Sequence, residues 1–330
     1  MTSKRYDVLA LGNAIVDVFA SAEEDFLVKY ELVKGSMALI DEPRAELLYG
    51  AMGPGKVVSG SSAANTIAGL ASFGGKGAFI GKVKADELGK LYRHDLTSLG
   101  VAFDTAAATG GPATARSFII VTPDGERTMN TYLGACQGLS PADVDPATVE
   151  NADIVYLEGY LFDPEDARRA FAKAAGLAHG AGRRIALTLS DAFVVERHRE
   201  SLLEFIDTQV DIVFANAAEI GSLFQTDDFD AAVQAIRGRA KIAAITRSEH
   251  GSVIVAGETL HEVQAARVEK VVDTTGAGDQ YAAGFLFGLA QGRPLDVCGR
   301  LGSLAAAEVI SHYGPRPQVS LRDLAAASGL

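Results

Sequence analysis

Residues 273–286 read DTTGAGDQYAAGFL, in which two glycines and an alanine precede a run of small and apolar residues. This run predicts a buried helix, and the small residues at its start leave backbone N–H groups uncovered. Because the positive end of the helix dipole adds to these amides, Gly276, Ala277 and Gly278 are candidates for an anion hole. Asp279 falls in the first helical turn, where it can accept a proton from a hydroxyl group beside a bound phosphate. The alternative is a tight turn capped by Asp279, and the whole string favours the anion hole.

Around this segment, short apolar runs bounded by Gly, Asp or Asn alternate with helical periods, which is typical of βαβ units. The runs lack a polar face, as expected for parallel strands that helices cover on both sides. We therefore predict an α/β fold with a mostly parallel central sheet. The predicted strands are Val8–Leu11, Ala78–Val83, Ile154–Leu157, Ile185–Leu189, Ile212–Ala215 and Ala243–Thr246. The predicted helices are Ala63–Ser72, Glu87–Ser98, Glu165–His179, Ala217–Phe224, Phe229–Gly238, Ala277–Ala290 and Val297–Ile310.

Two stretches break this alternation. Residues 16–20 and 36–40 read as short strands, and residues 117–133 hold two apolar runs around the turn PDGE at 123–126, which predicts a β-hairpin. These strands indicate a small second sheet, which is either a lid over a cleft or a set of edge strands without a role. Because no repeat or linker is visible, we expect one domain, residues 1–330, with a β lid formed from about residues 14–45 and 110–134.

Composition excludes several classes of function. The 330 residues carry 30 Lys and Arg against 42 Asp and Glu, a net charge of −12, which argues against nucleic acid and against anionic membranes as partners. No run approaches the ~20 apolar residues that span a bilayer. The two cysteines, Cys136 and Cys298, lie far apart outside any CxxC pattern, so a disulfide framework and a cysteine zinc site are excluded and a cytoplasmic location is expected.

A second candidate segment is SGSSAAN at residues 59–65, which opens a predicted helix. Small residues let a ligand approach the backbone, and Asn65 can both donate to and accept from a polyol. The alternative is a serine-capped helix. The nearby GAMGPGKV, residues 50–57, has P-loop spacing, but Val57 replaces the required Ser or Thr and the segment follows an apparent helix, so we interpret it as a loop.

A third segment, Asn216-Ala217-Ala218-Glu219, follows an apolar run and is therefore expected at the carboxyl end of a strand, where open α/β sheets bind ligands. Glu219 can hold a water molecule bound to Mg²⁺, and Asn216 can contact a phosphate. The alternative is a helix cap in which asparagine and the glutamate three residues on bond each other.

Together these motifs resemble the ribokinase-like (PfkB) family of carbohydrate and nucleoside kinases. Residues 273–279 are similar to its C-terminal signature, 60–81 to its N-terminal signature and 216–219 to its NxxE motif. The segments LGNAIVD (11–17), DFLVKY (25–30), LTLS (187–190) and VDIVFAN (210–216) resemble the adenosine kinases within it. The resemblance implies a ribokinase-like three-layer αβα sandwich with a β lid. It also implies ATP-dependent phosphorylation of the 5′ hydroxyl of adenosine to give AMP and ADP, with Mg²⁺ and with K⁺ as a further cation.

The resemblance also implies roles for individual residues. Asp279 is then the catalytic base beside the anion hole of Gly276, Ala277 and Gly278. The residues implied in acceptor binding are Asp17, Gly60, Ser61 and Asn65 at the ribose, with Asn13, Met37, Leu39 and Tyr160 at the base. Those implied on the ATP side are Arg127, Asn216, Thr246 and Gly251, with Glu219 toward Mg²⁺ through water and with Asp273 and Thr275 near a monovalent cation. Two alternatives stay open: Met37 and Leu39 as lid core, and Arg127 as a solvated hairpin residue.

The chain departs from the family pattern at three places. Ser61 and Ser248 stand where the family usually has glycine, and Gln280 follows the base where a small residue is common. A kinase for a free sugar or for inosine or guanosine is therefore the alternative, and the expected partners are small molecules, with the protein a monomer or homodimer. A nucleoside- or sugar-binding sensor would not need Asp279. An NAD-linked oxidoreductase is disfavoured because the glycine motif lacks its third glycine.

Overall fold

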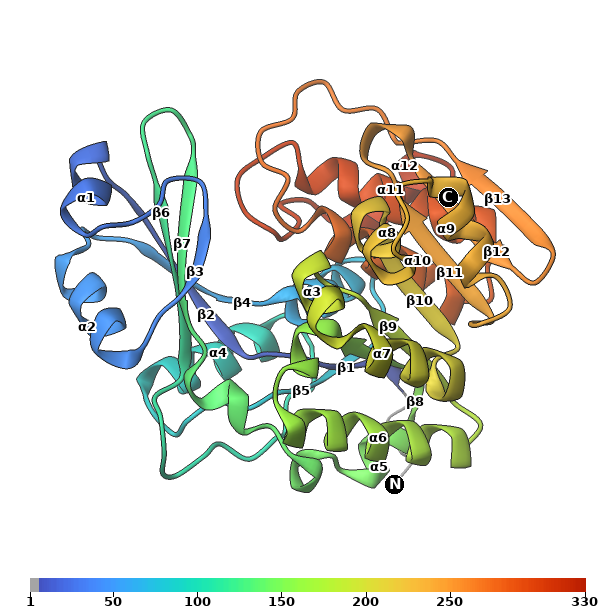
Figure 1. The fold of residues 1–330 in the computed structure, drawn as a ribbon, viewed down its shortest axis with the longest axis horizontal. Helices are drawn as coiled ribbons and strands as arrows, with labels where there is room; N and C mark the ends of the chain where they lie inside the picture. The colour runs from blue at the N-terminus through green and yellow to red at the C-terminus, as the bar shows by residue number, and fades with distance from the viewer. Residues whose placement is uncertain (1–5) are drawn as a thin grey trace.

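The computed structural model describes residues 6–330 and contains two sheets (Figure 1). The main sheet has eight strands in the order β13-β12-β11-β10-β9-β8-β1-β5. Its six parallel strands are β1 (Tyr6–Leu11), β5 (Gly77–Ile80), β8 (Ala152–Glu158), β9 (Arg184–Thr188), β10 (Ile212–Asn216) and β11 (Ile242–Thr246). The antiparallel hairpin of β12 (Ser252–Ala256) and β13 (Thr259–Val263) extends one edge. The predicted α/β fold with a mostly parallel sheet is confirmed.

Helices cover both faces of the main sheet, because side chains along each strand alternate between two apolar cores. Leu9 and Leu11 of β1 enter one core, and Val8 and Ala10 enter the other. The first core is covered by α5 (Pro146–Glu150), α6 (Glu165–Gly180), α7 (Ala192–Gln209), α8 (Ala217–Phe224) and α9 (Phe229–Ile236). The second is covered by α3 (Ser62–Ser72), α4 (Glu87–Ser98), α10 (Ala277–Ala290) and α11 (Leu295–Val309), with α12 (Leu321–Ala327) packed on α3 and α11.

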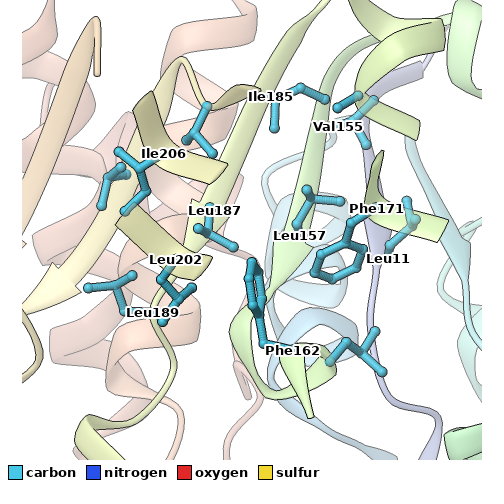
Figure 2. Close-up of a cluster of buried hydrophobic side chains, with 14 of the residues drawn as sticks. Leu11, Val155, Leu157, Phe162, Phe171, Ile185, Leu187, Leu189, Leu202 and Ile206 are labelled. Carbon is cyan, nitrogen blue, oxygen red and sulfur yellow. The ribbon is translucent and has the colours of Figure 1, made fainter. Parts of the chain in front are cut away.

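Figure 2 shows part of the first core, where Leu157 and Leu187 of the sheet lie near Phe171 of α6 and Leu202 of α7. The phenylalanine ring and the leucines are fully buried. Burying each such side chain contributes about 1.5–3 kcal/mol. This packing fixes the strands, and so fixes where their carboxyl ends present polar residues.

The second sheet has the order β3-β7-β6-β2-β4 and lies beside the main body (Figure 1). Its strands are β2 (Ile15–Ser21), β3 (Met37–Leu39), β4 (Lys56–Gly60), β6 (Ala115–Val121) and β7 (Arg127–Tyr132), accompanied by α1 (Glu24–Lys29) and α2 (Glu42–Ala51). The predicted hairpin over residues 117–133 is confirmed as the pair β6 and β7. The segment 50–57 runs from the last turn of α2 through a loop into β4, so no strand precedes it.

Strand β4 lies outside the ranges predicted for the lid, although it pairs with β2 and belongs to the second sheet. It leads directly through Ser61 into α3 and therefore joins the second sheet to the core of the main one. Within residues 6–330, no helix combines the length and the apolar character that a membrane span requires.

Candidate active site

The site lies where the carboxyl ends of the parallel strands meet. After β1 the chain crosses to β5 on one side, whereas β8, β9, β10 and β11 follow one another on the other side. The reversal between β1 and β8 is the position at which open α/β sheets bind ligands. Asn13 follows β1 and Glu158 ends β8, so both lie at this reversal.

The start of α10 has the geometry of an anion hole. Gly276 caps the helix with φ of 81°, and a Cβ there would lie 2.7 Å from atoms of Pro315, so only glycine fits. No side chain of the described residues caps this helix end. The amide of Ala277 donates to the carbonyl of Thr274, at 3.2 Å, and the amide of Gln280 donates to the carbonyl of Gly276, at 2.9 Å. The amides of Gly278 and Asp279 have no backbone partner among the described residues, so these two remain open to an anion. A Cβ on Gly278 would meet nothing within 4 Å, so an anion can approach the backbone there.

Asp279 faces α3 and does not cap its own helix. Its carboxylate accepts hydrogen bonds from Ser62 Oγ, at 2.6 Å, and from Asn65 Nδ2, at 3.1 Å. Burial raises the pKa of Asp279 to about 6, and these two hydrogen bonds oppose the rise because they favour the ionised form. The carboxylate is therefore ionised at neutral pH and close enough to its pKa to take up a proton.

Asp17 is a second buried carboxylate in the same site, and only 8% of it is exposed. It sits against Gly60, where a Cβ would lie 2.1 Å from Asp17 Oδ2, so the close approach requires glycine. Burial raises the pKa of Asp17 to about 7; Arg316 and Arg127 oppose this rise, and the charge of Asp279 adds to it. Asp17 and Gly60 are therefore in contact, and their role in binding the ribose remains a prediction.

Glu158 is a site residue that the sequence reasoning missed. It is fully buried, and its Oε1 accepts from the backbone N and from Nδ2 of Asn13, at 3.3 and 2.7 Å. Its Oε2 accepts from Ser61 Oγ, at 2.8 Å, and from the amide of Ala63, at 2.9 Å. Burial raises the pKa of Glu158, and these bonds oppose the rise. One buried carboxylate therefore holds together the end of β1 and the start of α3.

Ser61 adopts a backbone conformation that glycine tolerates and other residues rarely do, with φ of 84° and ψ of 151°. Such a conformation costs about 1–3 kcal/mol. We predict that Ser61→Gly and Ser61→Ala both lose the bond to Glu158, but that only the glycine variant relieves the strain. The free energy of unfolding, measured in urea, should then be about 1–3 kcal/mol higher for the glycine than for the alanine variant. Equal stabilities would contradict strain at this position.

Ser248, the other departure from glycine, also has a positive φ, of 50°. It lies in the loop between β11 and β12 near Gly251, which has φ of 79° and where a Cβ would lie 2.0 Å from the carbonyl of Val263. Thr246 ends β11, beside the end of β10. Thr246 and Gly251, two of the residues implied on the ATP side, thus lie at the same edge of the sheet as a third, Asn216.

Asn216 and Glu219 form the reciprocal cap that was the structural alternative for this motif. Asn216 N and Nδ2 donate to the two carboxylate oxygens of Glu219, at 3.0 and 2.7 Å, and Glu219 N donates to Asn216 Oδ1, at 2.8 Å. Burial raises the pKa of Glu219 to about 7. The cap holds the glutamate at the carboxyl end of β10. Its contact with a hydrated Mg²⁺ ion remains a prediction.

Arg127 of the second sheet contacts the loop that precedes α10. It forms an ion pair with Asp273, at 2.6 Å, and donates to Thr275 Oγ1, at 3.2 Å. Its side chain is largely buried, so the alternative of a solvated hairpin arginine is wrong. The amide of Gly314 also donates to Asp273. A monovalent cation near Asp273 and Thr275 remains a prediction, and the carboxylate there already has a cationic partner.

Met37 and Leu39 lie on β3, the edge strand of the second sheet, and are 50% and 60% exposed. The alternative that they form a core of the lid is therefore wrong. Tyr160 lies in a short 3₁₀ helix, Gly159–Phe162, directly after β8. Tyr160 packs on the first core of the main sheet. The contact of these three residues with an acceptor remains a prediction.

A mostly parallel sheet, an open helix N-terminus at its carboxyl edge and a buried carboxylate beside it define a phosphotransferase that acts on an alcohol group. Comparison with known proteins gives the family. Residues 53–321 match the model of the pfkB family of carbohydrate kinases, and the chain belongs to this family of carbohydrate and nucleoside kinases.

Three relatives illustrate its range. A crystal structure of adenosine kinase from Sinorhizobium meliloti is 52% identical with a TM-score of 0.91, covering 98% of this chain and 99% of that one. A probable sugar kinase from Rhizobium etli CFN 42 is 50% identical with a TM-score of 0.92, covering 99% of each chain. Adenosine kinase from Saccharomyces cerevisiae is 26% identical over 334 residues, covering 93% of this chain and 96% of the yeast protein. Sugar and nucleoside kinases are thus represented at similar identity.

Proposed function

We propose that this protein is an adenosine kinase, which transfers the γ-phosphoryl group of ATP to the 5′ hydroxyl of adenosine and releases AMP and ADP. The observation that carries the proposal is the arrangement of Asp279 at the open end of α10, opposite α3. The 52% identity to the Sinorhizobium meliloti adenosine kinase supports the acceptor. The proposed location is the cytoplasm, and the proposed assembly is a monomer or homodimer.

In this proposal Asp279 accepts the proton of the 5′ hydroxyl while the hydroxyl oxygen attacks the γ-phosphorus of ATP. The bond from that phosphorus to the oxygen bridging to ADP breaks, and ADP leaves with the electron pair. The free amides at the start of α10 stabilise the negative charge on the transferring group. We propose that Arg127, which bonds Asp273 and Thr275 in the loop before α10, adds positive charge from the second sheet. We propose that this sheet is a lid that excludes water when it closes.

Kinases of this family use ATP with Mg²⁺. Within residues 6–330, no three His, Cys, Asp or Glu side chains are grouped as a metal site. This fits Mg²⁺, which proteins commonly hold through substrate phosphates, waters and one or two carboxylates. The buried Glu219 is the carboxylate that we propose for the hydrated ion. When bound, Mg²⁺ would neutralise the phosphate charge.

We propose that the acceptor lies between Asp17 and α3, with the ribose diol donating to Asp17 and with Gly60, Ser61 and Asn65 beside it. Two vicinal hydroxyls can both donate to one carboxylate. Asn13 is fixed by Glu158 through its Nδ2, which leaves its carbonyl oxygen as the group that can receive a donor. We propose that this group, with Met37, Leu39 and Tyr160, contacts the base.

A second candidate function is phosphorylation of a free sugar or of another nucleoside. The 50% identity to the probable sugar kinase from Rhizobium etli favours it, at nearly the same similarity as the adenosine kinase. Two departures from the family pattern also support this alternative, because Ser61 bonds Glu158 and Gln280 bonds the backbone of Asn65, which we propose beside the acceptor.

The acceptor can be identified by thermal unfolding. We expect adenosine to raise Tm more than inosine, guanosine, ribose or fructose at equal concentration, because a ligand that binds only the folded state stabilises it by RT ln(1 + [L]/Kd). ADP release with ATP and Mg²⁺ should rank the acceptors in the same order. The control is the Asp279→Asn variant, which should keep the Tm shift and lose the turnover. If ribose or fructose is turned over well and adenosine poorly, the adenosine assignment is wrong.

A further inference from the structure

Arg316 reaches into the site from the segment between α11 and α12. Its three guanidinium nitrogens donate to three different side chains. Nε donates to Asn65 Oδ1, at 3.3 Å, Nη1 to Asp95 Oδ2, at 3.1 Å, and Nη2 to Ser59 Oγ, at 2.8 Å. The side chain is 18% exposed. Asp95 of α4 also accepts from the backbone N of Ser59, at 2.8 Å, so the guanidinium has an anionic anchor that is itself held in place.

The orientation of the Asn65 amide follows from its two neighbours. Arginine has only donors, whereas an ionised carboxylate has only acceptors. The amide oxygen must therefore face Arg316 and the amide nitrogen must face Asp279, as observed. If the amide turned over, its oxygen would face the carboxylate and the bond to Asp279 would be lost. The cation at Arg316 thus determines which group Asn65 presents to Asp279.

The segment that carries Arg316 is attached to the anion hole. Pro315 packs on Gly276, and the buried Gln280 donates from Nε2 to the carbonyls of Pro315, at 2.9 Å, and of Asn65, at 3.0 Å. A small residue at position 280 would not make these two bonds. Gln280 therefore links α10, α3 and the segment after α11 at one point.

We infer that Arg316 is a positioning residue for phosphoryl transfer: anchored by Asp95, it orients Asn65 so that its amide donates a hydrogen bond to the base Asp279. The inference rests on the proposed role of Asp279. It does not depend on which alcohol is the acceptor. The inference gives a role to Arg316, which lies 251 positions from Asn65 in the sequence.

Loss of Arg316 should make Asp279 harder to ionise, because the hydrogen bond from Asn65 lowers its pKa. Ser62 and Asn65 of α3 bond Asp279 directly. Four further titratable groups interact with Asp279 electrostatically: Asp17 of β2, Tyr156 of β8, Tyr160 after β8 and Glu219 of α8. Two cations, Arg316 and Arg127, lower the pKa of Asp17 and so affect its charge near Asp279. Of these, only Arg316 bonds the side chain of Asn65.

The test is the pH dependence of kcat for Arg316→Gln, Arg316→Lys and the control Arg322→Gln, an exposed arginine on α12. We expect Arg316→Gln to lower kcat about 2-fold at pH 7 and up to about 10-fold below pH 6, where the ionised fraction of Asp279 falls most. The acidic limb of the pH profile of kcat should move to higher pH by about one unit in this variant, so that the loss of kcat is smaller at high pH. Arg316→Lys keeps the positive charge but not the forked set of donors, so its kcat should lie between those of Arg316→Gln and the wild type. The control should match the wild type, and Tm reports whether each variant is folded.

A double variant separates positioning of Asn65 from a direct effect of the charge on Asp17. If Arg316 acts through Asn65, then adding Arg316→Gln to Asn65→Ala should not move the acidic limb of kcat further. A further shift in the double variant, or an unshifted limb in folded Arg316→Gln, would overturn the inference. Absence of ADP release by the wild type with every alcohol tested would instead overturn the proposed function itself.

Discussion

Replacing Asp279 with asparagine is expected to lower kcat by about 10²–10⁴-fold, the usual contribution of a general base. The substitution removes the proton acceptor and keeps nearly the same shape beside Ser62 and Asn65. Acceptor KM should change little, because Asp279 acts on the reacting hydroxyl and its loss falls on the transition state. Steady-state kinetics across acceptor concentrations measures both quantities.

The pH profile of the wild type supports the same assignment. Because the pKa of Asp279 is about 6, kcat should rise as pH increases through 6 and then level off. The control is Asp207→Asn, an exposed carboxylate on α7 that pairs with Arg239, whose kcat should match the wild type. A fully active asparagine variant at position 279 would falsify the role of base.

The sequence predicted the main sheet well because strands that helices cover on both faces are continuously apolar, which makes them easy to recognise. Each of the six predicted strands corresponds to an observed one, although β5 ends at Ile80 and not at Val83 as predicted, and the helices at 87–98, 217–224 and 277–290 have the predicted bounds. The two-sided burial of β1 explains why the run at residues 8–11 reads as continuously apolar. The signal is weaker in α7 and in the hairpin β12 and β13, which the sequence reading missed. The helix carries charged residues along most of its length, and the hairpin lies at the sheet edge, where one strand is largely exposed.

The parts of the candidate site that could be predicted are those whose residues lie close together in the sequence. The anion hole and Asp279 lie within four consecutive residues, so spacing alone indicates their geometry. Glu158 and Arg316 were missed because their partners are distant: Glu158 bonds Ser61, 97 positions away, and Arg316 bonds Asn65. A glutamate at the end of the apolar run 152–158 was the one available signal, since a carboxylate at the carboxyl end of a buried strand must find donors. Nothing comparable marks Arg316.

Replacing Asp17 with alanine or asparagine is expected to raise acceptor KM by about 10- to 100-fold, because hydrogen bonds to a charged group contribute ~1.5–3 kcal/mol. The effect on kcat should be smaller, since Asp17 would hold the diol and not the reacting hydroxyl. Wild-type binding should also strengthen as pH rises through 7, because burial holds the pKa of Asp17 near 7 and the diol needs the ionised form. Calorimetry with the acceptor at pH 6 and pH 8 measures this, and an unchanged KM in Asp17→Asn would reject the role.

Stability provides the control that separates lost binding from misfolding. The pKa of Asp17 in the folded protein, about 7, lies above its usual value of 3.8, so the folded state binds more protons between these values. The contribution of Asp17 to stability is therefore fully present below pH ~4 and is lost as pH rises through about 7. The Asp17→Asn variant has no carboxyl group to ionise at this position, so it does not lose this stability as pH rises. Without acceptor, the free energy of unfolding of the variant minus that of the wild type should therefore increase from pH 5 to pH 8. Urea denaturation at each pH measures this difference. A folded, more stable variant that binds the acceptor poorly would show that the buried charge is retained for binding.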